Sequence, residues 1–202
     1  MPPFVGLTGG IGSGKSTALA ALERLGCAVL STDAVVHELY SSPAVIAAVG
    51  ERFGSDVAPG GVVDRSLVAE RAFATAEGRE WLEQLLWPKV GQRMADWKAE
   101  AERAQPAPRA IVVEVPLLFE SGLDHGYDAT IAVVADEGLR AQRAGARGHR
   151  ALDERAARQL TQAEKAARST YVVVNDGEIA ELEAKLSAVL DKMTSGANER
   201  DR

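Results

Sequence analysis

The 202-residue sequence contains one cysteine, Cys27, and therefore can form neither an intrachain disulfide nor a multi-thiolate metal site. Because this cysteine usage fits a reducing compartment, we expect a cytoplasmic protein. The chain also lacks apolar runs long enough to cross a bilayer, and residues 1–4 lack the basic start of a secretory signal, so we expect no membrane partner. Its three histidines are scattered without metal-ligand spacing, which disfavours a protein-encoded transition-metal site.

Basic residues are outnumbered by acidic ones: Lys and Arg total 23 and Asp and Glu total 29, which gives a formal net charge of −6. This balance disfavours a broad nucleic-acid-binding surface, and it requires any anionic ligand to be held locally. We therefore expect a small-molecule partner and no nucleic-acid partner. The 46% hydrophobic content is typical of a globular chain, and the length suffices to bury a core without disulfides or metals.

Short apolar runs alternate with helical patterns along the chain. Strands are predicted at residues 4–8, 28–30, 110–115, 130–134 and 171–174. The run 110–115 is apolar on both faces, a pattern typical of buried parallel strands. Strands separated by helical connections require crossovers, so we predict an α/β fold, with a five-stranded parallel sheet and helices on both of its faces.

We expect a single domain over residues 1–193, followed by a disordered tail at 194–202. The parts of this domain are a core at about 1–42 and 109–193 and a helical insertion at about 43–104. The insertion is expected to be interrupted by the Gly/Pro-rich stretch 54–61 and by Pro88. Further helices are predicted at 16–25, 34–40, 138–162 and 179–193.

A glycine-rich turn follows the first predicted strand. Residues 9–17, GGIGSGKST, match the phosphate-binding pattern G-x-x-x-x-G-K-[ST]. Glycines let consecutive backbone N–H groups point at phosphate oxygens, and the helix that follows adds the positive end of its dipole. Lys15 is expected to reach the β- and γ-phosphates and Ser16 to ligate magnesium. The predicted nucleotide-binding residues are Gly9, Gly10, Gly12, Ser13, Gly14, Lys15, Ser16 and Thr17.

Binding of a nucleoside triphosphate leaves two uses open, hydrolysis for switching and transfer to an acceptor. The guanine-nucleotide signatures N-K-x-D and D-x-x-G do not occur, and the two asparagines, Asn175 and Asn198, both precede acidic residues. A kinase needs a carboxylate beside the γ-phosphate to accept the proton of the acceptor hydroxyl. Asp33 suits this role, because it follows the second predicted strand at the carboxyl edge of the sheet. It equally suits the N-cap of the helix at 34–40.

Several segments, in order along nearly the whole chain, resemble the dephospho-coenzyme A kinase family. The first is VGLTGGIGSGKST at 5–17, and Asp33 matches an aspartate that the family carries after its second strand. The other segments are Val63-Asp64-Arg65, Arg71-Ala72-Phe73, VPLLFE at 115–120, Arg158-Gln159, Glu164-Lys165 and VVVNDG at 172–177. Beyond the phosphate loop each segment alone is a weak signal, whereas their order and spacing together are specific.

The resemblance implies a P-loop kinase fold and transfer of the γ-phosphoryl group of ATP, with Mg²⁺, to the ribose 3′-hydroxyl of 3′-dephospho-coenzyme A. It implies Asp33 as the base, Lys15 as the charge stabiliser and Arg143 as a catalytic residue of a lid at about 140–160. Arg143 and Arg147 share one helical face, for which a solvated charged surface is the alternative. The insertion corresponds to the family's acceptor-binding domain. The implied acceptor-binding residues are Asp33, Arg65, Trp87, Leu118 and Glu120, and the implied metal ligands are Ser16 and Glu114.

Three positions depart from the family pattern. Ser31 replaces an aspartate two positions before the implied base, and it cannot ionise. Glu114 stands where the third strand usually ends in aspartate; it still permits a water-mediated magnesium contact, and a structural carboxylate is the alternative. Trp87 replaces the histidine of a His-Pro pair, so no acid–base role survives, and core packing is the alternative to contact with the acceptor. Another small-molecule kinase and a non-catalytic ATP-dependent switch stay open as functions.

Overall fold

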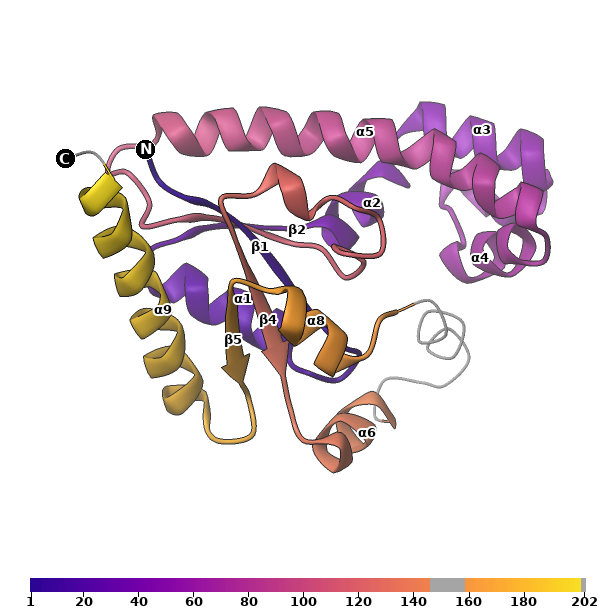
Figure 1. The fold of residues 1–202 in the computed structure, drawn as a ribbon. Coiled ribbons are helices and arrows are strands. Elements are labelled where there is room, and N and C mark those ends of the chain that lie inside the picture. The colour runs from indigo at the N-terminus through magenta and orange to yellow at the C-terminus, as the bar shows by residue number, and fades with distance from the viewer. Residues whose placement is uncertain (146–158, 201–202) are drawn as a thin grey trace. The chain divides into compact units, whose positions relative to one another are not determined.

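The computed structural model describes residues 1–145 and 159–200 and contains a five-stranded sheet (Figure 1). The strands are β1 Phe4–Gly9, β2 Ala28–Ser31, β3 Ile111–Glu114, β4 Ala129–Val134 and β5 Tyr171–Val174. Their order across the sheet is β2-β3-β1-β4-β5. β1 pairs in parallel with β3 and with β4, and β4 pairs in parallel with β5, which confirms the predicted parallel architecture.

The chain divides into two compact units, where the sequence suggested a single domain. Residues 1–30 and 100–202 form the sheet unit, and residues 31–99 form a helical unit. Helices α1 Lys15–Arg24, α6 Glu137–Gly145, α8 Gln162–Arg168 and α9 Ile179–Arg200 and the 3₁₀ turn η3 Asp124–Gly126 belong to the sheet unit. The helical unit contains α2 Thr32–Leu39, α3 Pro43–Phe53, η1 Ser55–Val57, η2 Pro59–Gly61, α4 Arg65–Phe73 and most of α5 Ala76–Arg103.

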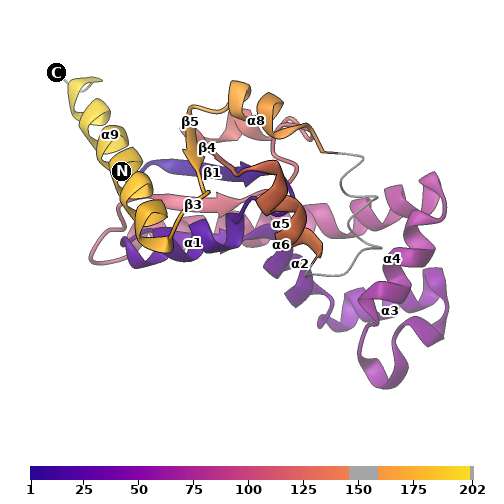
Figure 2. The ribbon, with the colours of Figure 1, turned by 90° about the horizontal axis from the view of Figure 1, so that it is seen from below.

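The core of the sheet unit follows from the alternation of side chains along its strands. Val5 and Leu7 of β1 are fully buried in one cluster with Leu22 of α1 and Leu186 of α9. Residues between them along the strand point to the opposite face, because successive side chains alternate across a sheet. Figure 2 shows α1 and α9 on one face of the sheet and α8 on the other. Both faces are therefore covered, as a parallel sheet requires.

The helical unit begins before the insertion expected at residue 43, because α2 packs with the insertion helices. Val36 and Leu39 of α2 lie against a core that includes the fully buried Val45 and Val49 of α3. Pro88 does not interrupt the helical pattern as expected, since α5 continues through it. A proline removes one backbone hydrogen bond, and the buried Leu82 and Leu86 before it hold α5 against the core. 

Two further differences concern the C-terminal half. The expected tail from residue 194 is helical as far as Arg200, as a continuation of α9 beyond the buried Met193. Helix α8 was not predicted, although Thr161 and Glu164 form a capping box at its start. None of the helices in the described part of the chain has the length and apolar content needed to cross a membrane.

Candidate active site

The phosphate-binding pattern forms the turn between β1 and α1, which is the strand–turn–helix context that the motif requires. Gly12 and Gly14 adopt positive φ angles of 77° and 89°, and α1 begins directly after Gly14. A Cβ atom at Gly14 would lie 2.1 Å from Nδ2 of Asn175, and one at Gly12 would lie 2.4 Å from the carbonyl oxygen of Arg140. Both positions therefore require glycine, for backbone conformation and for space.

The charged and hydroxyl groups of the loop are arranged around its backbone. Lys15 extends back across the turn, where Nζ donates to the carbonyl oxygens of Gly9 and Gly10, each at 3.1 Å. Ser16 is exposed in the first turn of α1. Ser13 is fully buried, and its Oγ has no hydrogen-bond partner among residues 1–145 and 159–200. Such an orphaned buried hydroxyl is uncommon in a native fold and is open to satisfaction by a bound ligand.

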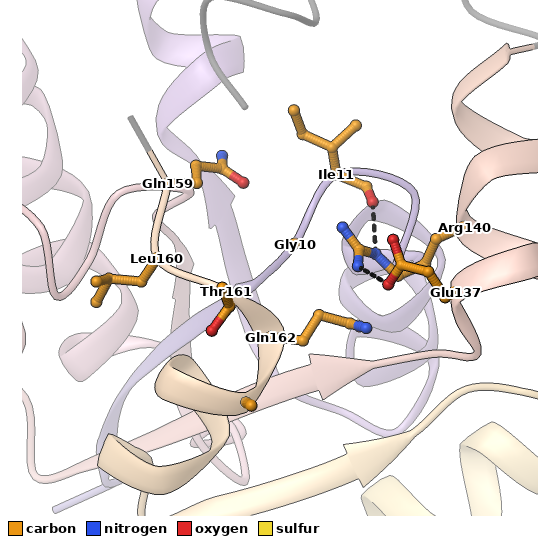
Figure 3. Close-up of a pocket in the computed structure, with 9 residues that line it drawn as sticks. Gly10, Ile11, Glu137, Arg140, Gln159, Leu160, Thr161 and Gln162 are labelled. Carbon is orange, nitrogen blue, oxygen red and sulfur yellow. Dashed lines mark hydrogen bonds and ion pairs between the residues drawn. The ribbon is translucent and has the colours of Figure 1, made fainter. Parts of the chain in front are cut away.

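Residues from two distant segments hold the loop from outside. Asn175 follows β5, is 6% exposed, and donates its side-chain amide to the Ser13 carbonyl oxygen at 2.8 Å. Arg140 of α6 donates Nε to the Ile11 carbonyl oxygen at 3.0 Å, and its Nη1 pairs with Glu137 at 2.6 Å (Figure 3). From the sequence, Arg140 was expected only as the start of the lid, and Asn175 only as part of a family segment. The available signal was that both follow predicted strands at the edge of the sheet where the loop lies.

Arg143, expected in the lid, lies near the loop within the sheet unit. Its Nη1 donates to the Asn175 carbonyl oxygen at 3.1 Å and would lie 3.9 Å from a Cβ atom at Gly14. Arg143 is therefore close to the segment where the phosphate loop becomes α1. Arg147 and the remainder of the expected lid from 146 to 158 lie outside the described residues.

A cavity of about 440 Å³ opens beside the loop. The first turn of the loop and α6 form one side of it, and the segment leading into α8 forms the other (Figure 3). Its lining residues are Gly10, Ile11, Glu137, Arg140, Gln159, Leu160, Thr161, Gln162 and Ala163. Five of the nine lining residues carry polar side chains and could bond a polar ligand that extends from the loop.

Three residues of the sheet unit that were expected in the site, Glu114, Leu118 and Glu120, are largely buried or already bonded to other protein groups. Glu114 ends β3 and is 7% exposed. Leu118 is fully buried against β1, with Cδ2 only 2.9 Å from where a Cβ atom at Gly6 would stand, so it packs in the interior and presents no surface to an acceptor. Glu120 pairs with the buried Lys165 at 2.9 Å and accepts a hydrogen bond from the Leu160 backbone N–H at 2.7 Å. The Glu120 carboxylate is therefore already bonded to other groups of the protein.

In the helical unit, Asp33 is exposed in the first turn of α2. The N-cap position belongs to Ser31, which makes no side-chain capping bond. The alternative that Asp33 caps this helix is therefore wrong, because the helix begins at Thr32 rather than at residue 34. Asp33 instead places a carboxylate near the positive end of α2, where a negative charge is favoured.

The other two expected acceptor-binding residues also belong to the helical unit. Arg65 is exposed at the start of α4, whose N-cap Asp64 accepts hydrogen bonds from the next turn. Trp87 is 57% exposed, so the core-packing alternative for this side chain is wrong. It lines a cavity of about 480 Å³ together with Glu80, Glu83, Gln84 and Pro88. The indole therefore presents an apolar face to solvent with carboxylates close by.

These features define the class of the protein. A parallel sheet, a phosphate loop between β1 and α1, and a lysine folded across that loop belong to a P-loop nucleotide-binding fold. Solved structures support this assignment. The dephospho-CoA kinase of Campylobacter jejuni matches with a TM-score of 0.70 at 22% identity, covering 98% of this chain and 100% of that one. The shikimate kinase of Aquifex aeolicus matches with a TM-score of 0.51 at 15% identity, covering 95% and 98%. The chain thus has the fold of P-loop kinases.

Sequence comparison then identifies the family. The family model described as dephospho-CoA kinase matches residues 3–181. The dephospho-CoA kinase of Deinococcus radiodurans is 37% identical, covering 95% of this chain and 93% of the relative, and that of Chlorobaculum tepidum is 36% identical, covering 96% of each. A structure of the Thermus thermophilus protein TT1252 matches at 32% identity with a TM-score of 0.75, covering 95% and 97%. The chain belongs to the dephospho-CoA kinase family, and ATP is its implied co-substrate.

Proposed function

We propose that this protein transfers the γ-phosphoryl group of ATP to the ribose 3′-hydroxyl of 3′-dephospho-coenzyme A, giving coenzyme A and ADP. This is the final step of coenzyme A biosynthesis. The observation that carries the proposal is the phosphate loop, in which Lys15 Nζ lies across the carbonyl oxygens of Gly9 and Gly10 in a chain of this family. The orphaned Ser13 hydroxyl in the same loop supports a site built for an additional polar ligand.

The loop would bind the triphosphate through its backbone N–H groups and the N-terminal end of α1. Lys15 would exchange its two carbonyl partners for β- and γ-phosphate oxygens, and would stabilise the charge that develops on the transferred group. Arg143 would add a second cation near the start of α1, where it already bonds the Asn175 backbone. These groups act by position and charge, which is where catalysis of phosphoryl transfer chiefly resides.

Asp33 would accept the proton of the 3′-hydroxyl as that oxygen bonds to the γ-phosphorus and the bond to ADP breaks. Its exposure in the first turn of α2 supports this role, because an acceptor can reach the carboxylate from solvent. In the helical unit, Arg65 would attract an acceptor phosphate and Trp87 would contact an apolar or aromatic part of the acceptor. The burial of Leu118 and the ion pair of Glu120 support no direct contact of these two residues with the acceptor.

The residues present suit a magnesium ion carried mainly by the triphosphate. Mg²⁺ prefers oxygen ligands, and the loop offers the exposed Ser16 hydroxyl, while Glu114 would contact a magnesium-bound water. Within residues 1–145 and 159–200 no cluster of three or more His, Cys, Asp or Glu side chains could hold a metal alone. Mg²⁺ supplies positive charge to the phosphate oxygens during transfer. Ser16 and the loop amides would orient the nucleotide around the ion.

A direct test measures ATP consumption and 3′-phosphorylation with dephospho-coenzyme A, in parallel with adenylates, shikimate and gluconate as acceptors. We expect ADP formation only with dephospho-coenzyme A, together with one 3′-phosphate per ATP consumed. Equal or faster turnover with another acceptor would assign a different small-molecule kinase. ATP binding without any acceptor-dependent turnover would assign a nucleotide-dependent switch.

We also propose a cytoplasmic location for this protein. It rests on the lone cysteine, which suits a reducing compartment, and on a coenzyme A precursor as the acceptor. Cell fractionation tests it, with recovery of the native chain in the cytosolic fraction as the expected result and recovery with exported proteins as the contrary one.

A further inference from the structure

The side chain of Lys165 is fully buried on the face of the sheet that α8 covers. Its Nζ donates to the Pro116 carbonyl oxygen at 2.6 Å and to Thr8 Oγ1 at 3.4 Å, and it pairs with Glu120 at 2.9 Å. An ammonium group has three donors, and three separate groups accept from it here. Burial lowers the pKa of Lys165, and the Glu120 carboxylate opposes that shift. The charge is therefore enclosed and its hydrogen-bonding capacity is used in full.

These contacts join parts of the site that are distant in the sequence. Thr8 is the residue of β1 directly before the phosphate loop. The same Glu120 carboxylate that pairs with Lys165 accepts the Leu160 backbone N–H at 2.7 Å. Leu160 lines the cavity opposite Gly10 (Figure 3). One ion pair thus connects the start of the loop to the far wall of the cavity beside it.

The wall itself is held in place by further contacts of the same segment. Thr161 and Glu164 close a capping box at the start of α8. The side-chain amide of Gln162 donates to the Ala135 carbonyl oxygen at 2.9 Å and accepts from the Ala135 N–H at 2.8 Å, which ties α8 to the end of β4. The stretch from Leu160 to Gln162 is therefore fixed to β4 by Gln162 and to β1 through Glu120 and Lys165.

A buried ion pair is an inefficient way to stabilise a fold. Desolvation of two charges offsets most of their attraction, and apolar residues of similar volume often stabilise as well or better. What such a pair supplies is a fixed geometry, because removal of either partner leaves an uncompensated buried charge. Here that geometry sets the distance between the phosphate loop and the Leu160 wall.

We propose that Glu120 and Lys165 are positioning residues for the nucleotide, holding the Leu160–Gln162 wall at the spacing from Gly10 that bound ATP requires. Neither side chain touches the reactants. This inference rests on the proposed function, because it takes ATP to occupy the loop and the adjoining cavity. It replaces the acceptor-binding role that the family resemblance implied for Glu120, and the two roles predict different kinetic changes.

The test uses three variants of the full chain, Glu120→Gln, Lys165→Met and the double variant. We expect each single variant to raise KM for ATP about tenfold, the scale of a modest displacement of a binding wall, with KM for dephospho-coenzyme A changed less than about twofold. The melting temperature of each single variant should also fall, since each leaves one buried charge unpaired. In the double variant both charges are gone, so the melting temperature should recover towards that of the parent while KM for ATP stays raised.

Leu186→Ala is the matched control, because it removes a fully buried side chain of α9 and destabilises the same unit without touching the cavity. It should lower the melting temperature and leave KM for ATP unchanged at a temperature where it is folded. A larger rise in KM for dephospho-coenzyme A than for ATP would return Glu120 to the acceptor site and overturn the proposal. The proposal would also be overturned if both KM for ATP and the melting temperature of the double variant returned to the parent values. Lys15→Ala tests the phosphate loop separately, so failure of one proposal is distinguishable from failure of the other.

Discussion

The side-chain amide of Asn175 donates a hydrogen bond to the Ser13 carbonyl oxygen at 2.8 Å, across a sequence separation of 162 residues. This bond brings the residue that follows β5 into contact with the phosphate loop, which follows β1. The carbonyl oxygen of Asn175 in turn accepts from Arg143. Asn175 is therefore a shared support of the loop and of an arginine expected to contact phosphate. Because Asn175 is 6% exposed, this support is rigid and leaves no room for a larger loop residue at Gly14.

Gly14→Ala should therefore weaken nucleotide binding while the chain still folds. An added Cβ atom would stand 2.1 Å from Asn175 Nδ2 at a φ angle of 89°, so the loop must shift. We expect ATP affinity to fall by at least about tenfold, measured by calorimetric titration. Gly122→Ala is the control, because Gly122 also has a positive φ angle but has nothing within 4 Å. It should cost about 1–2 kcal/mol of stability and leave ATP affinity unchanged. Normal ATP affinity in Gly14→Ala would contradict the steric argument.

Lys15→Ala should lower turnover by at least about a hundredfold, since a positioned cation on the β- and γ-phosphates stabilises the transition state by several kcal/mol. Its two hydrogen bonds to loop carbonyls are local, so the melting temperature should change little. Steady-state turnover and a thermal melt on the same preparation check both expectations. Near-normal turnover in a folded Lys15→Ala protein would break the argument from the phosphate loop.

Asp33→Asn keeps the shape of the side chain but cannot accept a proton. We expect a folded protein that still binds ATP and loses about a hundredfold or more in 3′-phosphorylation, the scale of general-base catalysis. Because Ser31 occupies the N-cap, the melting temperature should fall little in Asp33→Asn. Asp64→Ala is a useful contrast, since Asp64 does cap α4 and its loss should cost about 0.5–2 kcal/mol. Turnover of Asp33→Asn at close to the parent rate would sink the proposed mechanism.

Arg143→Ala should lower turnover and leave the dissociation constant for dephospho-coenzyme A little changed, because Arg143 lies beside the phosphate loop. Arg143→Lys keeps the charge but loses the forked geometry, so it should recover only part of the rate. Acceptor affinity is measured by titration in the absence of ATP. An equal loss of acceptor affinity and turnover would place Arg143 in the acceptor site instead.

Cys27 should be unreactive in the native protein. It is 7% exposed, and burial raises its pKa from 9.0 to about 11. A thiol reagent at pH 8 should therefore modify Cys27 only on unfolding, with protein unfolded in denaturant as the comparison. Because the folded state keeps a proton that the unfolded state loses above pH 9, stability should fall as pH rises from 9 to about 11. Rapid modification of native protein at pH 8 would refute this.

Local patterns along the sequence predicted most of the fold. Short apolar runs predicted all five strands to within one residue at each end, and the glycine-rich turn predicted the phosphate loop. Those signals are local because strand periodicity and turn conformation depend on neighbouring residues. The continuation of α5 through Pro88 is the complementary case, because a proline disfavours helix locally and the burial of Leu82 and Leu86 overrides that preference. Helix α9 also extends beyond its predicted end at Met193, as far as Arg200.

The sequence by itself determined the class of chemistry, because the loop motif carries its backbone conformation and its lysine within nine consecutive residues. Only the tertiary structure decided which distant side chains complete the site. Asn175 and Arg140 meet the loop because parallel strands bring their carboxyl ends to one edge of the sheet. Lys165 reaches Thr8, directly before the loop, from helix α8 on one face of the sheet. Lys165, which the sequence offers only as part of a family segment, is buried and paired there, since burial is a property of packing rather than of residue type.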